Sequence, residues 1–579
     1  MRKYWKYIKP YLPAFILGPI LMIVEVIGEM LMPILMASII DNGVATRDYA
    51  YIIARGGLMV GVAILMLLGG VGGAYFGAKA SVGFSSDMRK DAFDKIQEMS
   101  FANLDSFSTG SLVTRLTNDI TQVQNLINMM LRMMLRAPGM LLGGLIMALM
   151  INARLALVLL VVLPMLIVLI VIVIKTAFPL FKGMQSKLDA LNNTVQEFLT
   201  SIRVIKSFVR EDYETGKFGK SNEELKDASV KALTLMILIM PIAGILMNGT
   251  TLAVVWFGGN QIIVGDMEVG SLTAFITYIT QILSSLMMVA FMLLQCSRAF
   301  ASLDRINEVM NAQIDVNDDN AAEPEKQVNS GSIEFKNVSY RYYKNSEEKV
   351  LDDVSFKIAS GETLGIIGST GSGKTTLVSM IPRLYDVDEG EVLVDGLNVK
   401  DYSLKNLREG VGMVLQKNVL FSGSIAENLR WGNEYASLDE LKEAARDAQA
   451  DSFIEEKENG YDYELEQGGT NVSGGQKQRL CIARALLKKP KILILDDSTS
   501  AVDTATEAKI REAFYGSLKD TTKIIIAQRI SSVIDADEII VMDDGKIAGI
   551  GNHKELLSSC VPYQEIYYSQ MDKEEEVNA

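Results

Sequence analysis

Two long apolar runs in the first half of the chain limit most strongly what it can fold into. Met140–Ile151 and Leu155–Ile174 contain no charged residue. With its flanks, each run is long enough to cross about 30 Å of hydrocarbon as a helix. The chain is therefore expected to be an integral membrane protein that lies in a lipid bilayer.

The first 300 residues contain six apolar segments that are expected to be membrane-spanning helices. They cover about 14–39, 52–80, 133–152, 155–176, 233–258 and 269–297. The long loops after the second and fourth spans have helical patterns and hold most of the nearby Lys and Arg, so these loops and both termini are predicted to be cytoplasmic. A short helix in each loop, around Ala102–Phe107 and Arg210–Lys217, is expected to touch the soluble domain; solvated loops are the alternative.

Charge and cysteine content argue against several classes of protein. The net charge is −14, and the acidic residues lie largely in the second half of the chain and in its tail, where they are expected to form a solvated surface. The sequence has no basic patch with interleaved aromatic residues, so nucleic acid is not an expected partner. The three cysteines are far apart and lack CxxC spacing, which gives neither a disulfide framework nor a zinc site.

A phosphate-binding loop is predicted at Gly368 to Thr375, which fits G-x-x-x-x-G-K-[ST] between an expected strand and an expected helix. Gly371 and Gly373 lack Cβ atoms, so successive backbone N–H groups can surround a phosphate at the positive end of the helix. Lys374 is expected to reach the β- and γ-phosphates, and Thr375 to offer its hydroxyl to Mg²⁺. The expected ATP-binding residues in this stretch are Gly368, Ser369, Thr370, Gly371, Ser372, Gly373, Lys374, Thr375 and Thr376.

The second half of the chain is predicted to be an α/β domain, because strands alternate with helices from Gly331 onward. Lys491 to Asp496 is an apolar strand that ends in a carboxylate, where a P-loop ATPase places a magnesium-associated aspartate. The expected division is a transmembrane domain over 1–310, a linker over 311–330, a nucleotide-binding domain over 331–570 and an acidic tail over 571–579.

Ser473-Gly474-Gly475-Gln476, followed by Lys-Gln-Arg-Leu-Cys-Ile-Ala-Arg, resembles the LSGGQ signature of ATP-binding cassette (ABC) proteins, with Val472 in the usual Leu position. The resemblance covers essentially the whole chain and looks like half of a type IV ABC exporter. It implies an all-α transmembrane domain of six helices followed by an α/β P-loop ABC nucleotide-binding domain. The implied activity is that of a transporter ATPase (translocase) that uses ATP and Mg²⁺.

The resemblance also implies roles for individual residues. Tyr342 would stack on adenine, and Asp503 would be the D-loop aspartate. Gln416 would be the Q-loop residue that links Mg²⁺ to the membrane domain, so that Thr375, Gln416 and Asp496 form the expected magnesium site. The short cytoplasmic helices would be coupling helices, of which the second usually reaches the nucleotide-binding domain of the partner. The signature residues Ser473 to Gln476 would face the ATP held by the partner.

Two positions depart from the family pattern at the expected catalytic groups. Asp497 stands where the family usually has a glutamate that orients the attacking water, and Gln528 stands where it has the switch histidine. The shorter carboxylate retracts the base, and a misplacement of about 1 Å can cost on the order of 10²-fold in rate. Gln528 cannot carry a positive charge beside the γ-phosphate. These departures resemble the degenerate half of heterodimeric bacterial multidrug exporters, which implies a second, non-identical half-transporter as partner; an active homodimer is the alternative.

Charged residues within spans suggest where a substrate could bind. Glu25 and Glu29 share one helix face, as do Arg132 and Arg136. The depths of Glu25 and Arg136 allow an ion pair, so mutual neutralisation and substrate binding both remain open. The candidate cavity residues are Glu25, Glu29, Gln281 and Met288.

The expected function is ATP-driven export of amphipathic compounds of the multidrug type across the bacterial plasma membrane by alternating access. A lipid or peptide exporter of the same architecture is one alternative. A regulatory or channel-like ABC subunit that does not pump is another.

Overall fold

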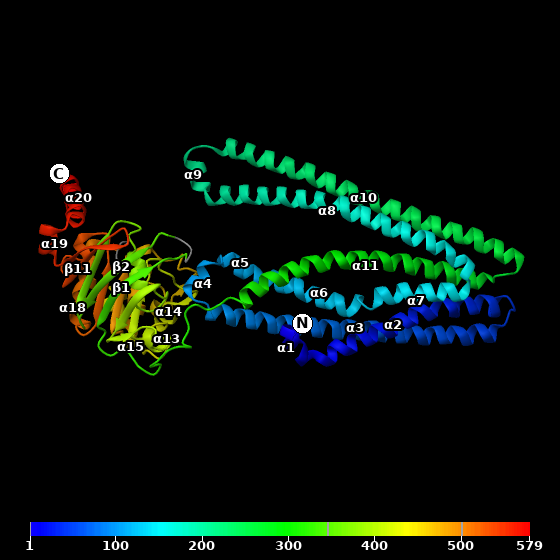
Figure 1. Cartoon of the computed structure of the whole chain (residues 1–579), viewed down its shortest axis with the longest axis horizontal. Helices are drawn as coiled ribbons and strands as arrows, with labels where there is room; N and C mark the ends of the chain where they lie inside the picture. The colour runs from blue at the N-terminus through cyan, green and yellow to red at the C-terminus, as the bar shows by residue number, and fades with distance from the viewer. Residues whose placement is uncertain (1, 344–346, 499–501, 579) are drawn as a thin grey trace. The chain divides into compact units, whose positions relative to one another are not determined.

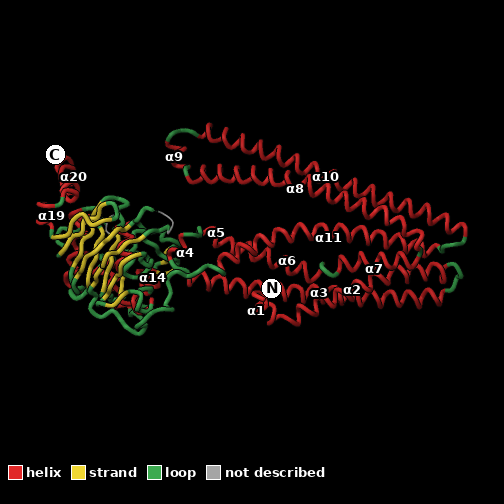
Figure 2. Tube along the Cα trace, in the orientation of Figure 1, coloured by secondary structure: helices red, strands yellow, loops and turns green. Residues whose placement is uncertain are grey.

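The computed structural model describes residues 2–343, 347–498 and 502–578. The chain forms two compact units, residues 1–96 with 109–311 and residues 97–108 with 312–579. The described residues of the first unit form helices and short connections, whereas the second unit combines helices with strands, shown in yellow in Figure 2.

The first unit is built from long helices and a few short ones, which Figure 1 labels along the chain. They are α1 (Trp5–Ile8), α2 (Leu12–Ser38), α3 (Tyr49–Glu98), α5 (Thr109–Thr114), α6 (Ile120–Met133), α7 (Arg136–Ile151), α8 (Ala153–Thr200), α9 (Ile202–Ser207), α10 (Glu211–Val264) and α11 (Val269–Met310). Within the described part of the chain, six helical segments are long and apolar enough to cross a membrane. The six predicted spans are therefore confirmed. These segments are Trp5–Val44, Tyr49–Glu98, Thr109–Ile151, Ala153–Thr200, Pro241–Val264 and Val269–Val289.

Glycines allow α2 and α3 to approach closely. A Cβ on Gly69 would lie 2.8 Å from the carbonyl oxygen of Leu21, and a Cβ on Gly70 would lie 3.2 Å from the carboxylate of Glu25. Small residues at such contacts are typical of helices that pack within a membrane. Just beyond the C-terminal end of α2, the Asp41 carboxylate accepts hydrogen bonds from the backbone N–H groups of the first turn of α11, at 2.6 and 3.0 Å. These two bonds cap α11 from a distant part of the chain.

Helices α8 and α10 run side by side as a hairpin that is joined through α9 (Figure 1). Near the Asn152 turn the hairpin packs into the unit, since Leu155 and Leu159 are buried together with Val254 and Phe275. Around α9 several apolar side chains are exposed: Phe208 is 72%, Val209 80% and Tyr213 66% exposed.

The second predicted short helix is misplaced. The structure forms it as α9 over Ile202–Ser207, whereas Arg210–Lys217 largely belongs to the first turns of α10. Val209 has a φ of 52°, which breaks the helix between α9 and α10. Acidic residues at 211, 212 and 214 then stabilise the positive end of the new helix.

The described residues of the second unit form three sheets and their covering helices. Its strands are β1 (Ile333–Tyr340), β2 (Leu351–Ile358), β3 (Thr363–Gly368), β4 (Glu389–Val394), β5 (Leu397–Asn398), β6 (Val411–Val414), β7 (Gly423–Ser424), β8 (Glu464–Leu465), β9 (Ile492–Asp496), β10 (Thr522–Ile526), β11 (Glu538–Asp543) and β12 (Lys546–Gly551). Its helices are α4 (Phe101–Asp105), α12 (Lys374–Ser379), α13 (Leu404–Gly410), α14 (Ile425–Arg430), α15 (Leu438–Asp447), α16 (Asp451–Glu455), α17 (Gly474–Leu487), α18 (Thr504–Ser517), α19 (His553–Ser559) and α20 (Val561–Asn578).

The central sheet has six strands in the order β12-β11-β3-β10-β9-β6, and only the edge pair β11–β12 is antiparallel. An antiparallel sheet of order β2-β1-β4-β5 lies in the same unit. Strands β9 and β10 are buried along their whole length, as expected for parallel strands covered on both faces. Because the carboxyl ends of parallel strands meet at one edge, the ends of β3, β9 and β10 lie together.

The second unit also includes the segment before its sheets and the helix at its carboxyl terminus. In the segment expected to be a linker, Val316 and Val328 are buried, and the Asn317 carbonyl accepts a bond from Arg383 at 3.1 Å. Toward the carboxyl terminus, α20 continues to Asn578, so the expected acidic tail is helical to that point. The domain limits inferred from the sequence remain predictions.

Helix α4 belongs to the same compact unit as the sheets. Ser100 and Asn103 form a capping box at its start, which explains why so short a helix begins there. Asp105 accepts a hydrogen bond from the Tyr385 hydroxyl at 2.8 Å, and the ring of Phe101 packs edge-on against the ring of Tyr385. The first predicted short helix therefore contacts the α/β domain.

Candidate nucleotide-binding site

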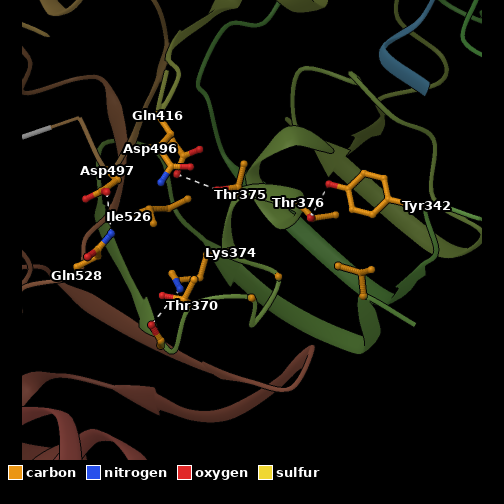
Figure 3. A pocket seen from close by; sticks show the side chains of 14 residues that line it. Tyr342, Thr370, Lys374, Thr375, Thr376, Gln416, Asp496, Asp497, Ile526 and Gln528 are labelled. Carbon is orange, nitrogen blue, oxygen red and sulfur yellow. Dashed lines mark hydrogen bonds between the residues drawn. The ribbon is translucent and has the colours of Figure 1, made fainter. Parts of the chain in front are cut away.

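A cavity of about 400 Å³ lies where β3, β9 and β10 end, within the size range of ligand pockets (Figure 3). It brings together residues that are far apart in the sequence. Its lining consists of Tyr342, Val350, Gly368, Thr370, Gly371, Gly373, Lys374, Thr375, Thr376, Gln416, Asp496, Asp497, Ile526 and Gln528. Twelve of these fourteen are residues that the sequence predicted for this site. The predicted Ser369 and Ser372 lie in the same loop.

The loop before α12 has the backbone that its glycines allow. Gly371 and Gly373 have φ values of 90° and 94°, in the left-handed region. A Cβ on Gly373 would lie 2.7 Å from the carbonyl oxygen of Val350, so the tight approach to β2 also requires glycine. The Lys374 ammonium donates to the carbonyls of Gly368 and Ser369 at 2.9 and 2.7 Å. Burial lowers the pKa of Lys374, while Asp496 and Asp497 oppose that shift.

The residues expected to hold Mg²⁺ fit that role. The Thr375 hydroxyl donates to one carboxylate oxygen of Asp496 at 3.1 Å, and Gln416 lines the same cavity (Figure 3). Among the described residues, the other oxygen of Asp496, Oδ2, is buried and has no hydrogen-bond partner. Burial raises the pKa of Asp496, and the bond from Thr375 opposes that shift. A buried oxygen without a protein partner beside a hydroxyl and an amide is a set of ligands that suits a hard divalent cation. Bound Mg²⁺ would neutralise charge on the phosphate oxygens.

Asp497 and Gln528 contact one another. The Gln528 side-chain amide donates to Asp497 Oδ2 at 2.9 Å (Figure 3). Burial raises the pKa of Asp497, and hydrogen bonds from Gln416 and Gln528 oppose that shift. Asp497 is also held through its backbone, with a φ of 46° and a bond from the Gln478 side chain to its carbonyl at 3.2 Å. The carboxylate expected to be catalytic is therefore short, held by its backbone and already engaged by a neutral donor.

Tyr342 lies at the other end of the cavity (Figure 3). Its hydroxyl hydrogen-bonds to the Thr376 hydroxyl at 2.9 Å, and its ring packs perpendicular to the ring of Tyr385. The tyrosine is 44% exposed, so part of its ring is available to a ligand. This position, on the opposite side of the loop from Asp496, fits the expected stacking on adenine.

The signature residues are not among those that line this cavity. They begin α17, where Ser473 and Gln476 form a capping box with bonds of 3.3 and 3.0 Å. Ser473 and Gly474 are exposed, so the positive end of a 14-residue helix faces solvent. Val472, which replaces the usual leucine, is buried in the domain core. Asp503 caps α18 by accepting a bond from the backbone of Thr506 at 2.9 Å.

A second polar cluster lies within the membrane-spanning helices of the first unit. Arg136 on α7 contacts both Glu25 and Glu29 on α2, at 3.1 and 2.5 Å. Gln281 on α11 donates to the backbone carbonyl of Glu29 at 3.5 Å. Arg132, which was predicted to share a helix face with Arg136, instead lines a separate cavity of about 320 Å³ with Gln122, Asn125 and Asn128. Met288 is half-buried on α11.

Some contributors to the nucleotide cavity carry no motif and were not predicted. Val350 and Ile526 line it, and Gln478 supports Asp497 from α17. Ile526 could have been found as the last residue of the strand beside Asp496, since parallel strands end at one edge. Gln478 lies in the stretch that follows the signature, and only the fold shows which way its side chain points.

Comparisons with known proteins show which family the two parts of the chain match. Residues 15–286 match the model of the ABC transporter transmembrane region, and residues 351–500 match that of the ABC transporter domain. The chain is 42% identical over 574 residues to the Bacillus subtilis protein YfiB, an uncharacterised ABC transporter ATP-binding protein, and the match covers 99% of each chain. It is 31% identical to Bacillus subtilis YgaD, provisionally named a multidrug export ATP-binding/permease protein, with 98% of each chain covered.

A solved structure of a bacterial Atm1-family ABC exporter with ATP bound is also similar. Its TM-score is 0.78 at 26% sequence identity, and the match covers 96% of this chain and 98% of that one.

Proposed function

The chain belongs to the ABC transporter family as an exporter half-transporter with a transmembrane and a nucleotide-binding domain, and from that premise we propose that it works as the degenerate half of a heterodimer. One observation carries the proposal: the catalytic position holds Asp497, and the switch position holds Gln528, which hydrogen-bonds to it. In this family each ATP site combines the Walker residues of one chain with the signature of the other. Hydrolysis then occurs chiefly at the site formed by this chain's Ser473 to Gln476 and the partner's catalytic glutamate and histidine.

The chemistry of phosphoryl transfer supports slow turnover at this chain's own Walker site. A base there must accept the proton of the attacking water and orient that water in line with the leaving group. Asp497 is one methylene shorter than glutamate, and its Oδ2 already accepts a bond from Gln528. Gln528 adds no positive charge to stabilise the transition state. ATP and Mg²⁺ bind at this site through Lys374, Thr375 and Asp496 and are released slowly.

The membrane unit also supports assembly with a second chain. The apolar side chains around α9, including Phe208, Val209 and Tyr213, are exposed in the single chain. A cytoplasmic loop that leaves such side chains in water gains stability when a partner surface covers them. In this proposal α9 is the second coupling helix and docks on the partner's nucleotide-binding domain. Both nucleotide-binding domains lie on the cytoplasmic side of the plasma membrane.

The proposed substrates are amphipathic compounds of the multidrug type, in line with the name of YgaD. Glu25, Glu29 and Arg136 together carry one excess negative charge when both carboxylates are ionised. Buried atoms of the same cluster, Glu29 Oε2 and Gln281 Oε1, have no hydrogen-bond partner among the described residues. An unbalanced carboxylate in a membrane favours a cationic ligand. Glu29→Gln should reduce export of a cationic dye more than export of a neutral one, and equal effects on both would contradict a role for Glu29 in binding cations.

The asymmetry is tested by ATP turnover of the purified heterodimer. Replacing the partner's catalytic glutamate by glutamine should abolish turnover, whereas Asp497→Asn in this chain should leave most of it. Equal losses from the two substitutions would refute the proposal. Uptake into inverted vesicles, compared between ATP and a non-hydrolysable analogue, distinguishes a pump from a channel.

A further inference from the structure

Helix α20 reaches the segment that carries the switch residue. The side-chain carbonyl of Gln570 accepts a hydrogen bond from the backbone N–H of Ile530 at 2.9 Å. The side-chain NH₂ of the same residue donates to the backbone carbonyl of Gln528 at 2.9 Å. One carboxamide thus bonds to the backbone on both sides of Arg529.

This arrangement copies the bonding of a β-bridge. Arg529 is extended, with φ −100° and ψ 133°, so the carbonyl of the preceding residue and the N–H of the following one point to the same side. The N–H and C=O of one residue in a neighbouring parallel strand would bond to those same two atoms. Gln570 supplies both bonds from a side chain, and it therefore fixes the backbone of residues 528–530 (the switch segment).

The switch segment in turn determines where the Gln528 side chain lies. Gln528 is exposed at the rim of the nucleotide cavity, and its amide reaches Asp497 at 2.9 Å. Beyond the switch segment Ile530 is buried, which anchors the other end of the segment in the core. An exposed side chain on a short connection depends on its backbone for orientation, because it has few packing contacts of its own.

The N-terminal part of α20 is anchored as well. The Tyr563 side chain is fully buried, and its hydroxyl hydrogen-bonds to Nδ1 of His553, the single histidine of the chain, at 2.7 Å. The ring of Tyr567 packs against the same imidazole. Because α20 is held at its start, Gln570 is presented to the switch segment from a fixed element.

We propose that Gln570 is a positioning residue that holds the switch segment so that Gln528 faces Asp497 and the nucleotide, and that it thereby slows release of ATP from this chain's Walker site. The inference rests on the proposed function in one respect, namely that ATP stays at this site long enough for release to be measured. Gln570 acts through backbone bonds to another residue and does not itself contact the nucleotide cavity.

The experiment follows release of a photoreactive ATP analogue with an azide on adenine from the full complex with Mg²⁺. The azide lies beside Tyr342 of the chain that binds it, so labelled bands on a gel report each chain separately. Gln570→Ala removes both hydrogen bonds and should speed release from this chain about fivefold or more, since the loss of one net hydrogen bond alone corresponds to about fivefold. Gln570→Glu should speed it at least as much, because its carboxylate faces the carbonyl of Gln528.

Gln564→Ala is the matched control. Gln564 also lies on α20, and its side chain donates to the carbonyl of Leu557 at 2.8 Å, away from the switch segment. Its replacement should change release by less than about twofold, since the bond that it removes does not contact the switch segment. If Gln570→Ala and Gln564→Ala have the same effect, Gln570 only stabilises the helix and the proposal is wrong.

A double-substitution cycle tests whether Gln570 acts through Gln528. Gln528→Ala should speed release by itself, and adding Gln570→Ala should then have no further effect. Additive effects would overturn the proposal. If the analogue is hydrolysed quickly on this chain in every variant, the proposed slow turnover is wrong, while the ranking of release rates still decides the role of Gln570.

Discussion

Two regions of the nucleotide-binding domain are expected to contact ATP, the Walker half and the signature half, and they differ in which residues of the family pattern they retain. The Walker half keeps its phosphate loop and the Thr375–Asp496 pair, but it pairs a short carboxylate with a neutral amide at Asp497 and Gln528. The signature half keeps Ser473 to Gln476 intact at the capped start of α17. Apart from Val472, the residues expected to bind nucleotide thus match the family pattern on both halves, whereas the two positions expected to activate water depart from it. This contrast is the basis of the proposal that binding and hydrolysis are separated between two sites of one transporter.

The largest effect is expected in the signature half. Gly475→Asp would place a carboxylate at the positive start of α17, where the partner's ATP is expected to bind, so turnover of the heterodimer should fall about 100-fold or more. Gly516→Asp is the matched control, because that glycine is exposed on α18 and a Cβ there meets no atom within 4 Å. The control should retain its turnover in an ATPase assay. If the heterodimer keeps its ATP turnover with Gly475→Asp, hydrolysis does not depend on the signature of this chain.

An intermediate effect is expected from restoring the Walker half. Asp497→Glu with Gln528→His would return a longer base and a group that can carry charge, which should raise hydrolysis at this chain's site about tenfold. The measurement is ATP turnover in a complex whose partner lacks its catalytic glutamate. Asp497→Glu alone serves as control and should give a smaller gain. An unchanged rate in the double variant would mean that these two positions do not limit hydrolysis.

The smallest effect concerns the pH dependence of nucleotide binding at this chain's Walker site. Burial raises the pKa of Asp496 and the charge of Asp497 raises it further, so Asp496 gains its proton at a higher pH than an ordinary carboxyl as the solution is acidified. Mg²⁺-dependent labelling of this chain by the azido nucleotide should therefore fall on acidification above the usual carboxyl range near about 4. Asp497→Asn removes the neighbouring charge, and the fall should move to lower pH. A shift to higher pH would contradict this coupling.

Local motifs and apolar runs made much of this structure predictable. The phosphate loop, Asp496 and the six spans follow from short patterns whose physical requirements are met within one or two elements. Helix depth allowed a pairing of Arg136 with Glu25, but depth did not show that Arg136 contacts both carboxylates. The rotation of each helix about its axis determines which side chains meet, and the sequence pattern of one helix does not show how the neighbouring helices are rotated.

Other features depend on tertiary contacts that have no sequence signal. The second short helix was misplaced because the break at Val209 is set by one left-handed residue that is not glycine. The bonds from Gln570 to the switch segment join residues about forty positions apart through an ordinary polar side chain. The direct bond between Gln528 and Asp497 was likewise visible only once β9 and β10 were placed side by side.

Turnover of the chain in isolation tests the central claim most directly. The full-length protein, purified without any partner and reconstituted in lipid, should bind ATP with Mg²⁺ but hydrolyse it slowly, and addition of the second half-transporter should raise hydrolysis about 100-fold. Rapid hydrolysis by this chain alone, coupled to transport, would contradict the account.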